Sequence, residues 1–191
     1  MAQDGIKKYK MLVIGGSAGS LEVILKIVAA LPVTDHLSAL IIVHRKNDGE
    51  SILQNLLSTR THLTVREIED KDTIIPGYIY IAPADYHVLF ENENMFSLDS
   101  SEKVHHSRPS IDVSFESVAE IFKDAAIGIL LSGANADGAA GLQSIQQCGG
   151  YTIVQEPQSA EVDFMPRQAL ELIDPDMVLN GDEMAEFIKR L

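Results

Sequence analysis

The sequence predicts an α/β protein: one doubly wound, mainly parallel sheet with helices on both faces and an inserted β-hairpin. Three apolar runs carry this prediction, at residues 11–14, 38–43 and 126–131, and a stretch with helical periodicity follows each of them. Continuous apolar strands that alternate with amphipathic helices are typical of parallel sheets covered on both faces.

The first half of the chain reads as strand and helix in turn. The strand 11–14 leads into a helix over 21–31, in which apolar residues recur at helical spacing and after which Pro32 follows. The second strand, 38–44, precedes a helix over 52–57 with Ser51 as its predicted N-cap. Two short strands are predicted at 64–68 and 78–81. Residues 86–90 and 95–98 predict a hairpin that turns at 92–94.

The second half continues the alternation. We expect a helix that begins at Ser110 or Asp112 and includes Phe122, then the strand 126–132 and a helix over 139–148 that ends at two glycines. A strand at 151–154, a helix at 165–172, a short edge strand at 177–179 and a last helix from Asp182 complete the chain. With no repeat or low-complexity linker, residues 1–191 are predicted to form one domain.

Composition excludes several classes of function. The chain has 28 acidic and 15 basic residues, a net charge of −13, which disfavours nucleic acid as a partner. No apolar run approaches the roughly 18–20 residues of a membrane span, so we expect no membrane insertion. The N-terminus lacks the apolar core of a signal peptide, and Cys148 is the one cysteine, which together favour the cytoplasm. No Cys/His cluster has metal-ligand spacing, so we expect no metal and no cofactor.

Three polar residues follow the three apolar strands. Ser17 lies in Gly15-Gly16-Ser17-Ala18-Gly19, His44 ends the second run, and Asp137 follows the third. The carboxyl ends of parallel strands share one rim, where ligands bind. Free N–H groups at the start of a helix after Ser17 would face a developing oxyanion. Ser17, His44 and Asp137 together suggest a hydrolytic triad.

Other functions of the same glycine-rich turn fit less well. The spacing of the glycines does not match G-x-G-x-x-G, and His44 stands where a dinucleotide-binding protein has an acidic residue. No Gly-Lys-Ser/Thr follows, as phosphate binding of the Walker type requires. Gly15-x-Ser17-x-Gly19 matches the nucleophile elbow of α/β-hydrolases, but their order is serine, acid, histidine, whereas His44 precedes Asp137 here.

Several motifs in order resemble the catalytic domain of the CheB protein-glutamate methylesterases of bacterial chemotaxis, from about residue 11 to residue 191. Besides the Ser17 turn, they are Ile79-Tyr-Ile-Ala-Pro83, His106-Ser-Arg-Pro-Ser-Ile-Asp112, Ser132-Gly-Ala-Asn-Ala-Asp-Gly-Ala-Ala-Gly141 and Phe164-Met-Pro-Arg167. The family commonly carries an N-terminal receiver domain. Because the first strand begins at Met11, we expect either a stand-alone esterase without that domain or a piece of a longer chain.

The resemblance implies a mechanism and a partner. Ser17 would be the nucleophile, His44 the general base and then acid, and Asp137 the residue that orients His44. The substrates would be glutamate methyl esters on the cytoplasmic helices of chemoreceptors or of a similar methylated signalling protein, and in some members also receptor glutamines. We expect the vicinity of the substrate and its oxyanion to be formed by Gly16, Ala18, Gly19, Arg45, Ala134 and Asn135.

The chain departs from the family pattern near the chemistry. Ala18 replaces the usual threonine, Arg45-Lys46 an apolar residue and proline, and Ala134-Asn135-Ala136 the usual Met-Gly-Asn. A catalytically weak or inactive receptor-binding module is therefore the alternative function. Arg45 and Lys46 either attract an acidic helix to the rim or extend into solvent.

Each candidate residue also has an ordinary structural interpretation. Ser17 would cap the first helix, Asp137 would be a loop or helix-cap aspartate, and His44 would be a rim histidine. His105 and His106 are expected to be surface or turn residues. Arg108 would either make structural hydrogen bonds or contact the substrate.

Overall fold

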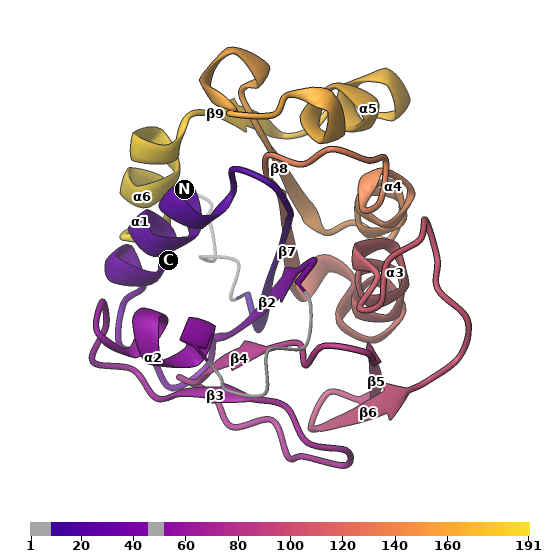
Figure 1. The fold of residues 1–191 in the computed structure, drawn as a ribbon. Coiled ribbons are helices and arrows are strands. Elements are labelled where there is room, and N and C mark those ends of the chain that lie inside the picture. Colours follow the sequence, from indigo (N-terminus) through magenta and orange to yellow (C-terminus); the bar gives the residue numbers. More distant parts are fainter. Residues whose placement is uncertain (1–8, 46–51) are drawn as a thin grey trace, which may run out of the picture.

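A single parallel sheet of seven strands organises the molecule (Figure 1), and its strand order is β3-β4-β2-β1-β7-β8-β9. The structure, a computed structural model, describes residues 9–45 and 52–191. Every neighbouring pair in this sheet is parallel. The strands are β1 (Met11–Gly16), β2 (Ser38–Val43), β3 (Val65–Glu67), β4 (Ile79–Ile81), β7 (Ala126–Leu130), β8 (Tyr151–Gln155) and β9 (Met177–Leu179).

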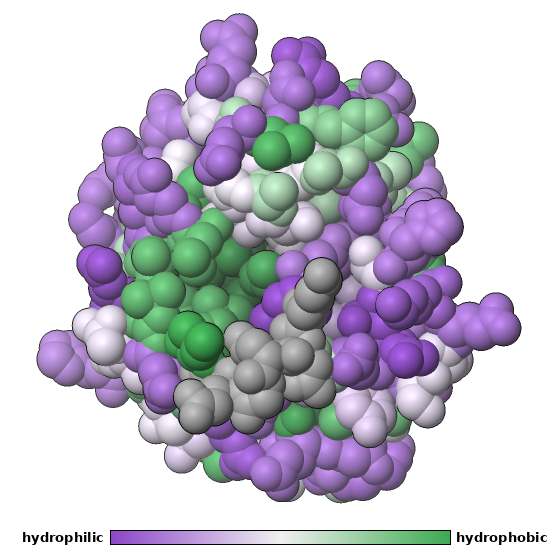
Figure 2. Space-filling model, in the orientation of Figure 1, coloured by the Kyte–Doolittle hydropathy of each residue, from purple (hydrophilic) through white to green (hydrophobic). Residues whose placement is uncertain are grey.

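Helices cover both faces of this sheet (Figure 1). One face carries α1 (Leu21–Ala30), α2 (Ile52–Ser58) and α6 (Gly181–Ile188). The other carries α3 (Ile111–Phe122), α4 (Ala139–Gln147) and α5 (Phe164–Leu172). The doubly wound α/β class predicted from the sequence is thus confirmed. In the part of the chain that the structure describes, no helix has the length and apolar character needed to cross a bilayer. On the face of the molecule that Figure 2 shows, hydrophilic side chains form most of the rim, and hydrophobic side chains gather on the left, the side that carries α1 and α2.

The central strands are buried on both faces, which explains their continuous apolar sequence. Every residue of β1 is buried. Met11 and Val13 pack into the core under α3 and α4, whereas Leu12 and Ile14 pack into the core under α1 and α6. This alternation follows from the strand period of two. Complete burial of one such side chain contributes roughly 1.5–3 kcal/mol.

The predicted hairpin is present as a separate antiparallel pair, β5 (His87–Asn92) and β6 (Met95–Asp99). It packs on α3 through aromatic rings: Phe90 lies 5.0 Å from Phe96 and 5.3 Å from Phe122, measured between ring centroids. Ser117 of α3 also accepts a hydrogen bond from the backbone N–H of Phe90 at 2.8 Å. The hairpin therefore braces α3, whose N-terminus reaches the candidate site.

Some element ends differ from the sequence prediction. Ser110 is the N-cap of α3, as one of the two predicted starts requires, and its hydroxyl accepts a hydrogen bond from Val113. The N-cap of α1 is Ser20, so Ser17 is not used to cap that helix. Two 3-10 turns, at Lys123–Ala125 and Pro157–Ser159, have no signal in the hydrophobic pattern. The predicted cap Ser51 lies outside the described residues.

Candidate active site

Ser17 lies in a tight turn between β1 and α1, at the carboxyl edge of the sheet. Its backbone N–H donates to the carbonyl of Ser132 at 2.9 Å, and its carbonyl accepts from the hydroxyl of Ser20 at 2.7 Å. Gly19 has a φ of 77°, and a Cβ there would come within 2.5 Å of Glu161 Cβ. Only glycine fits both constraints without strain. The turn thus fixes the backbone of Ser17 from both sides.

The parallel register brings His44 beside this turn. Gly16 of β1 pairs with Val43 of β2, and the N–H of His44 reaches the Gly16 carbonyl at 3.4 Å. Ser17 and His44 are therefore the next residues after a paired position on two neighbouring strands. Among the described residues, the Ser17 hydroxyl itself has no hydrogen-bond partner.

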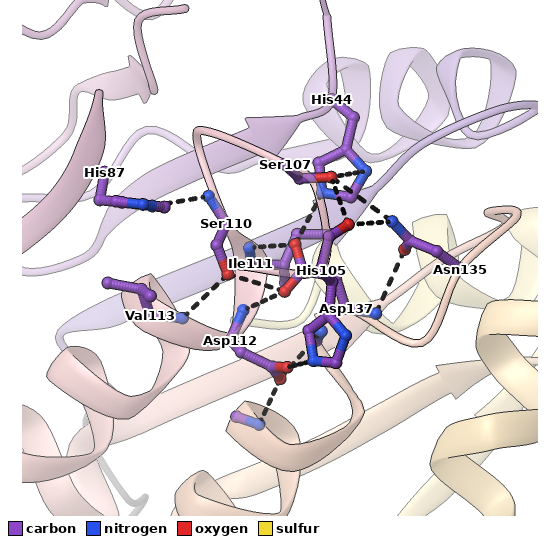
Figure 3. Close-up of polar contacts among 12 residues, drawn as sticks. His44, His87, His105, Ser107, Ser110, Ile111, Asp112, Val113, Asn135 and Asp137 are labelled. Atoms are coloured by element: carbon purple, nitrogen blue, oxygen red, sulfur yellow. Dashed lines mark hydrogen bonds and ion pairs between the residues drawn. The ribbon is translucent and has the colours of Figure 1, made fainter. Parts of the chain in front are cut away.

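His44 is held by Asp137, which comes from the loop after β7 (Figure 3). Nε2 of His44 lies 2.7 Å from Oδ2 of Asp137, and the Asp137 side chain is fully buried. An ionised carboxylate only accepts hydrogen bonds, so this contact places the ring proton on Nε2. The other ring nitrogen, Nδ1, is then the acceptor that can take a proton.

Asp137 accepts four hydrogen bonds from the residues that the structure describes. Its remaining donors are the N–H groups of Ile111 and Asp112 at 2.7 and 2.9 Å and the hydroxyl of Ser110 at 2.8 Å. These groups form the N-terminal turn of α3, whose dipole also favours a negative charge. Asp137 therefore caps α3 from across the loop while it orients His44. The helix-cap interpretation and the triad interpretation of Asp137 both describe this arrangement.

These contacts decide the charge of Asp137. Burial by itself would raise the pKa of this carboxyl, but the hydrogen bonds from His44, Asp112, Ile111 and Ser110 outweigh burial and leave the pKa below its usual value. Asp112 lies next to it and behaves oppositely: burial and the charge of Asp137 raise its pKa, although the N–H groups of Gly141 and Gly138 bind its carboxylate. Of the two carboxyl groups, that of Asp137 therefore loses its proton more readily.

A buried histidine, which the sequence analysis did not single out, supports this cluster. Nδ1 of His87 accepts the N–H of Ser110 at 3.1 Å, and its Nε2 donates to the Glu102 carbonyl at 3.0 Å. Both ring nitrogens are therefore satisfied, and His87 fixes the backbone whose side chain binds Asp137. A lone histidine at the start of a strand gives no sequence signal for this role.

Ser107 is the second residue that sequence reasoning missed. Its hydroxyl lies 3.4 Å from Nδ1 of His44, so Ser107 and Asp137 contact the ring at its two nitrogens (Figure 3). The amide of Asn135 donates to the same hydroxyl at 3.4 Å. His105 and His106, just before it, have positive φ values of 48° and 62°. They are turn residues, as expected, and the turn carries Ser107 to His44.

Backbone donors near Ser17 are available for an oxyanion. In the described part of the chain, the N–H groups of Ala18 and Gly19 donate no hydrogen bond. The turn that presents them is anchored by Ser132, whose hydroxyl donates to the Ala18 carbonyl at 2.7 Å and accepts the N–H of Val162 at 2.9 Å. Ala134 is exposed on the facing loop, and Asn135 accepts the N–H of Asp137 at 3.2 Å. The predicted vicinity residues 16, 18, 19, 134 and 135 thus lie on the loops that carry the three candidate residues.

A cavity of about 420 Å³ opens beside His44. Its lining includes Ser107 and the side chains of Arg45, Asp85, Lys103, His106 and Arg108.

Arg45 is 16% exposed and forms an ion pair with Glu67, which offsets its charge locally. The alternative that Arg45 simply extends into solvent is therefore wrong, whereas attraction of an acidic helix stays a prediction; Lys46 lies outside the described residues. Nη1 of Arg108 donates to the carbonyls of Ser100 and Ser101, both at 2.7 Å, so this residue has the predicted structural hydrogen bonds and also faces the cavity.

The described residues contain no group of three His, Cys, Asp or Glu side chains that could hold a metal ion. The cluster around Asp137 is instead saturated by N–H and O–H donors, which a cation would not tolerate. The chemistry available is that of a histidine base, its carboxylate and a nearby hydroxyl.

The chain is similar to one family of known proteins over nearly its whole length. A sequence model of the CheB methylesterase family matches residues 12–188. A curated relative from Leptospira interrogans is 40% identical over 185 residues, which are 96% of this chain and 95% of the relative. The Photorhabdus laumondii protein-glutamate methylesterase/protein-glutamine glutaminase is 36% identical over 184 residues, 95% of this chain and 52% of that protein. The crystal structure of the Thermotoga maritima CheB methylesterase catalytic domain superposes with a TM-score of 0.89 at 30% identity, covering 96% of this chain and 98% of that one.

Proposed function

Because the chain belongs to the CheB methylesterase family, we propose that it is a serine hydrolase that removes methyl groups from glutamate γ-methyl esters on the cytoplasmic signalling helices of chemoreceptors. The observation that carries this proposal is the 2.7 Å contact between His44 Nε2 and Asp137 Oδ2 beside the Ser17 turn. It leaves Nδ1 of His44 as a proton acceptor at the rim. The enzyme would act in the cytoplasm, where such helices lie.

In the first half-reaction, Ser17 Oγ attacks the ester carbonyl while Nδ1 of His44 takes its proton. Asp137 stabilises the imidazolium that results, because its buried carboxylate already accepts the hydrogen bond from Nε2–H of His44. The N–H groups of Ala18 and Gly19 support the carbonyl oxygen as it becomes negative. The tetrahedral intermediate then collapses, and methanol leaves with the proton from Nδ1.

In the second half-reaction, a water molecule gives its proton to Nδ1 and attacks the acyl-enzyme, which releases the glutamate carboxylate and restores Ser17. A receptor glutamine would enter the same path with ammonia in place of methanol. We therefore propose glutamine deamidation as a second reaction of this site, in line with the name of the Photorhabdus laumondii relative.

The two ring nitrogens are used in the opposite sense from chymotrypsin-like proteases, where aspartate binds Nδ1 and serine binds Nε2. Here Asp137 takes Nε2, so the nucleophile must approach the nitrogen nearer to the His44 backbone. A nucleophile on the neighbouring strand end meets this requirement. Ser17 follows Gly16, whose carbonyl already contacts the His44 N–H.

One observation favours the alternative, a receptor-binding module with weak or no activity. The hydroxyl that faces Nδ1 of His44 in this structure is that of Ser107, at 3.4 Å, and Asn135 of the altered loop donates to it. If this contact persisted in the complex with substrate, Ser17 would lack its base. The alternative thus makes a different prediction for the reactivity of Ser17.

Covalent trapping separates these functions. The protein is incubated with a fluorophosphonate, which forms a stable bond only with an activated serine, and the labelled peptide is identified by mass spectrometry. Methanol release from methyl-esterified receptor is measured in parallel. We expect methanol release and a label on Ser17. A label on Ser107 would reassign the nucleophile, and receptor binding with neither label nor methanol would favour the binding module.

A further inference from the structure

The cavity beside His44 has a charge opposite to that of the whole protein. The chain carries a net charge of −13, yet three of its 15 basic residues, Arg45, Lys103 and Arg108, line this one cavity. Among the residues that the structure describes, one carboxylate, that of Asp85, lines it with them. Even with Arg45 offset by Glu67, Lys103 and Arg108 exceed Asp85 by one positive charge. A cavity of this kind favours an anion in a protein that otherwise repels anions.

Arg108 is held in place without using all of its donors. Its Nη1 is anchored by the carbonyls of Ser100 and Ser101. A guanidinium has five N–H donors. In the described part of the chain, Nε of Arg108 has no partner but is buried, so the donors open to a ligand are those on Nη2, which also have no partner. The anchor lowers the entropy that a ligand must otherwise remove from a long side chain. Arg108 is thus a pre-positioned cation at the cavity wall.

Lys103 supplies a second cation from the same loop. It is exposed, and no ion pair holds it among residues 9–45 and 52–191. The other basic side chains that lie near carboxylates do pair, as Arg66 does with Asp72 and Lys71 with Glu91. Lys103 therefore remains available to an anion that enters from outside.

We propose that this cavity is a carboxylate subsite, in which Lys103 and Arg108 bind a glutamate side chain of the substrate helix. The inference rests on the proposed esterase function, because His44 lines the same cavity. Residues three or four apart on a helix lie roughly 5–6 Å from each other. A glutamate one turn from the methylated residue would therefore reach this cavity while the ester lies at His44. The site then selects acidic helices over neutral ones.

The test compares two helical peptides with one glutamate methyl ester, flanked one turn away by either glutamate or glutamine. A third peptide, flanked by lysine, serves for the charge-reversal variant. We expect the wild-type protein to hydrolyse the glutamate-flanked peptide with a kcat/KM about fivefold higher, the order expected for a partly exposed ion pair. Lys103→Gln should remove most of this preference, and Lys103→Glu should shift it toward a lysine-flanked peptide. Lys189→Gln, which removes the lysine at the C-cap of α6, is the matched control and should retain the preference.

Two further measurements make each outcome decisive. A small neutral methyl ester reports the chemistry alone: if it is hydrolysed but the two peptides react equally, the subsite is wrong and the proposed function stands. Fluorescence anisotropy of non-hydrolysable peptides reports binding without chemistry, so that a protein with no esterase activity still tests the subsite. Tighter binding that requires only the flanking glutamate supports the proposal. If binding becomes tighter only when the central residue is a free glutamate, as in the product of hydrolysis, then the cavity binds the reaction product, and the proposal is overturned.

Discussion

The backbone N–H of Asp112 donates to Oδ1 of Asp137 at 2.9 Å, so two acidic residues meet at the first turn of α3. The Asp112 carboxylate in turn accepts the N–H groups of Gly138 and Gly141, at 2.9 and 2.7 Å. Each aspartate therefore binds the backbone beside the other. The candidate catalytic loop and the start of α3 are held together as one unit, and changes to Asp137 should affect activity and stability together.

Asp137→Asn should lower kcat by about 10⁴-fold, because an uncharged amide cannot stabilise the His44 imidazolium and its NH₂ group can donate to Nε2, which holds the wrong ring tautomer. The measurement is methanol release from methylated receptor, with wild-type protein as the reference. A loss of less than about tenfold would contradict the proposed role of Asp137.

The same substitution should destabilise the fold by about 1–3 kcal/mol at pH 7, since an asparagine offers one acceptor oxygen to four donors. The pKa of Asp137 in the folded protein lies below its ordinary value of 3.8. The ionised side chain therefore contributes fully to the free energy of unfolding above pH 3.8, and this contribution is lost as the pH falls through the pKa of the folded state. Denaturant unfolding should show a constant gap between variant and wild type above about pH 5, which narrows below about pH 4. Asp163→Asn, at an exposed aspartate, is the control and should show no such gap.

Ser17→Ala should remove nearly all esterase activity. The corresponding loss of kcat in a serine protease is on the order of 10⁶-fold. Ser107→Ala should keep kcat within about tenfold of wild type, because Ser107 contacts the base without lying in the turn that offers backbone donors. His44→Ala should resemble Ser17→Ala. The reverse ranking of the two serine variants would make Ser107 the nucleophile.

The rate should fall on the acid side of the pH profile, because Nδ1 of His44 must be free of a proton to take the one from serine. The pH profile of kcat/KM on a small methyl ester measures this directly, and EDTA should leave it unchanged. A rate that stays flat from about pH 5 to 8 would point to a different base or to a rate-limiting step without proton transfer.

Ser132→Ala should lower kcat by about tenfold to a hundredfold, with a small effect on KM, because the Ser17 turn loses the hydroxyl that binds the Ala18 carbonyl and the Val162 N–H. Ser159→Ala removes an exposed hydroxyl that binds Glu156 and serves as the control. If Ser132→Ala lowers only the melting temperature and leaves kcat unchanged, Ser132 stabilises the fold without positioning the turn.

The sequence by itself determined the sheet and the shared rim. Buried parallel strands have continuous apolar sequences, so β1, β2 and β7 were predictable from local composition. Once these strands are neighbours, the register that pairs Gly16 with Val43 places Ser17 and His44 side by side. Asp137 follows the third of these strands and reaches the same edge.

Only the tertiary structure decided which partners meet those residues. Ser107 reaches His44 through a turn with two left-handed histidines, and Arg45 finds Glu67 on β3. Ser110 to Asp112 reach Asp137 across 25 to 27 positions of the chain. Hydrophobic periodicity records whether a residue is buried, but it does not record which distant polar group satisfies it. Such contacts arise when loops from separate strands close over a common edge, and the free energy that selects them depends on all the donors and acceptors present there.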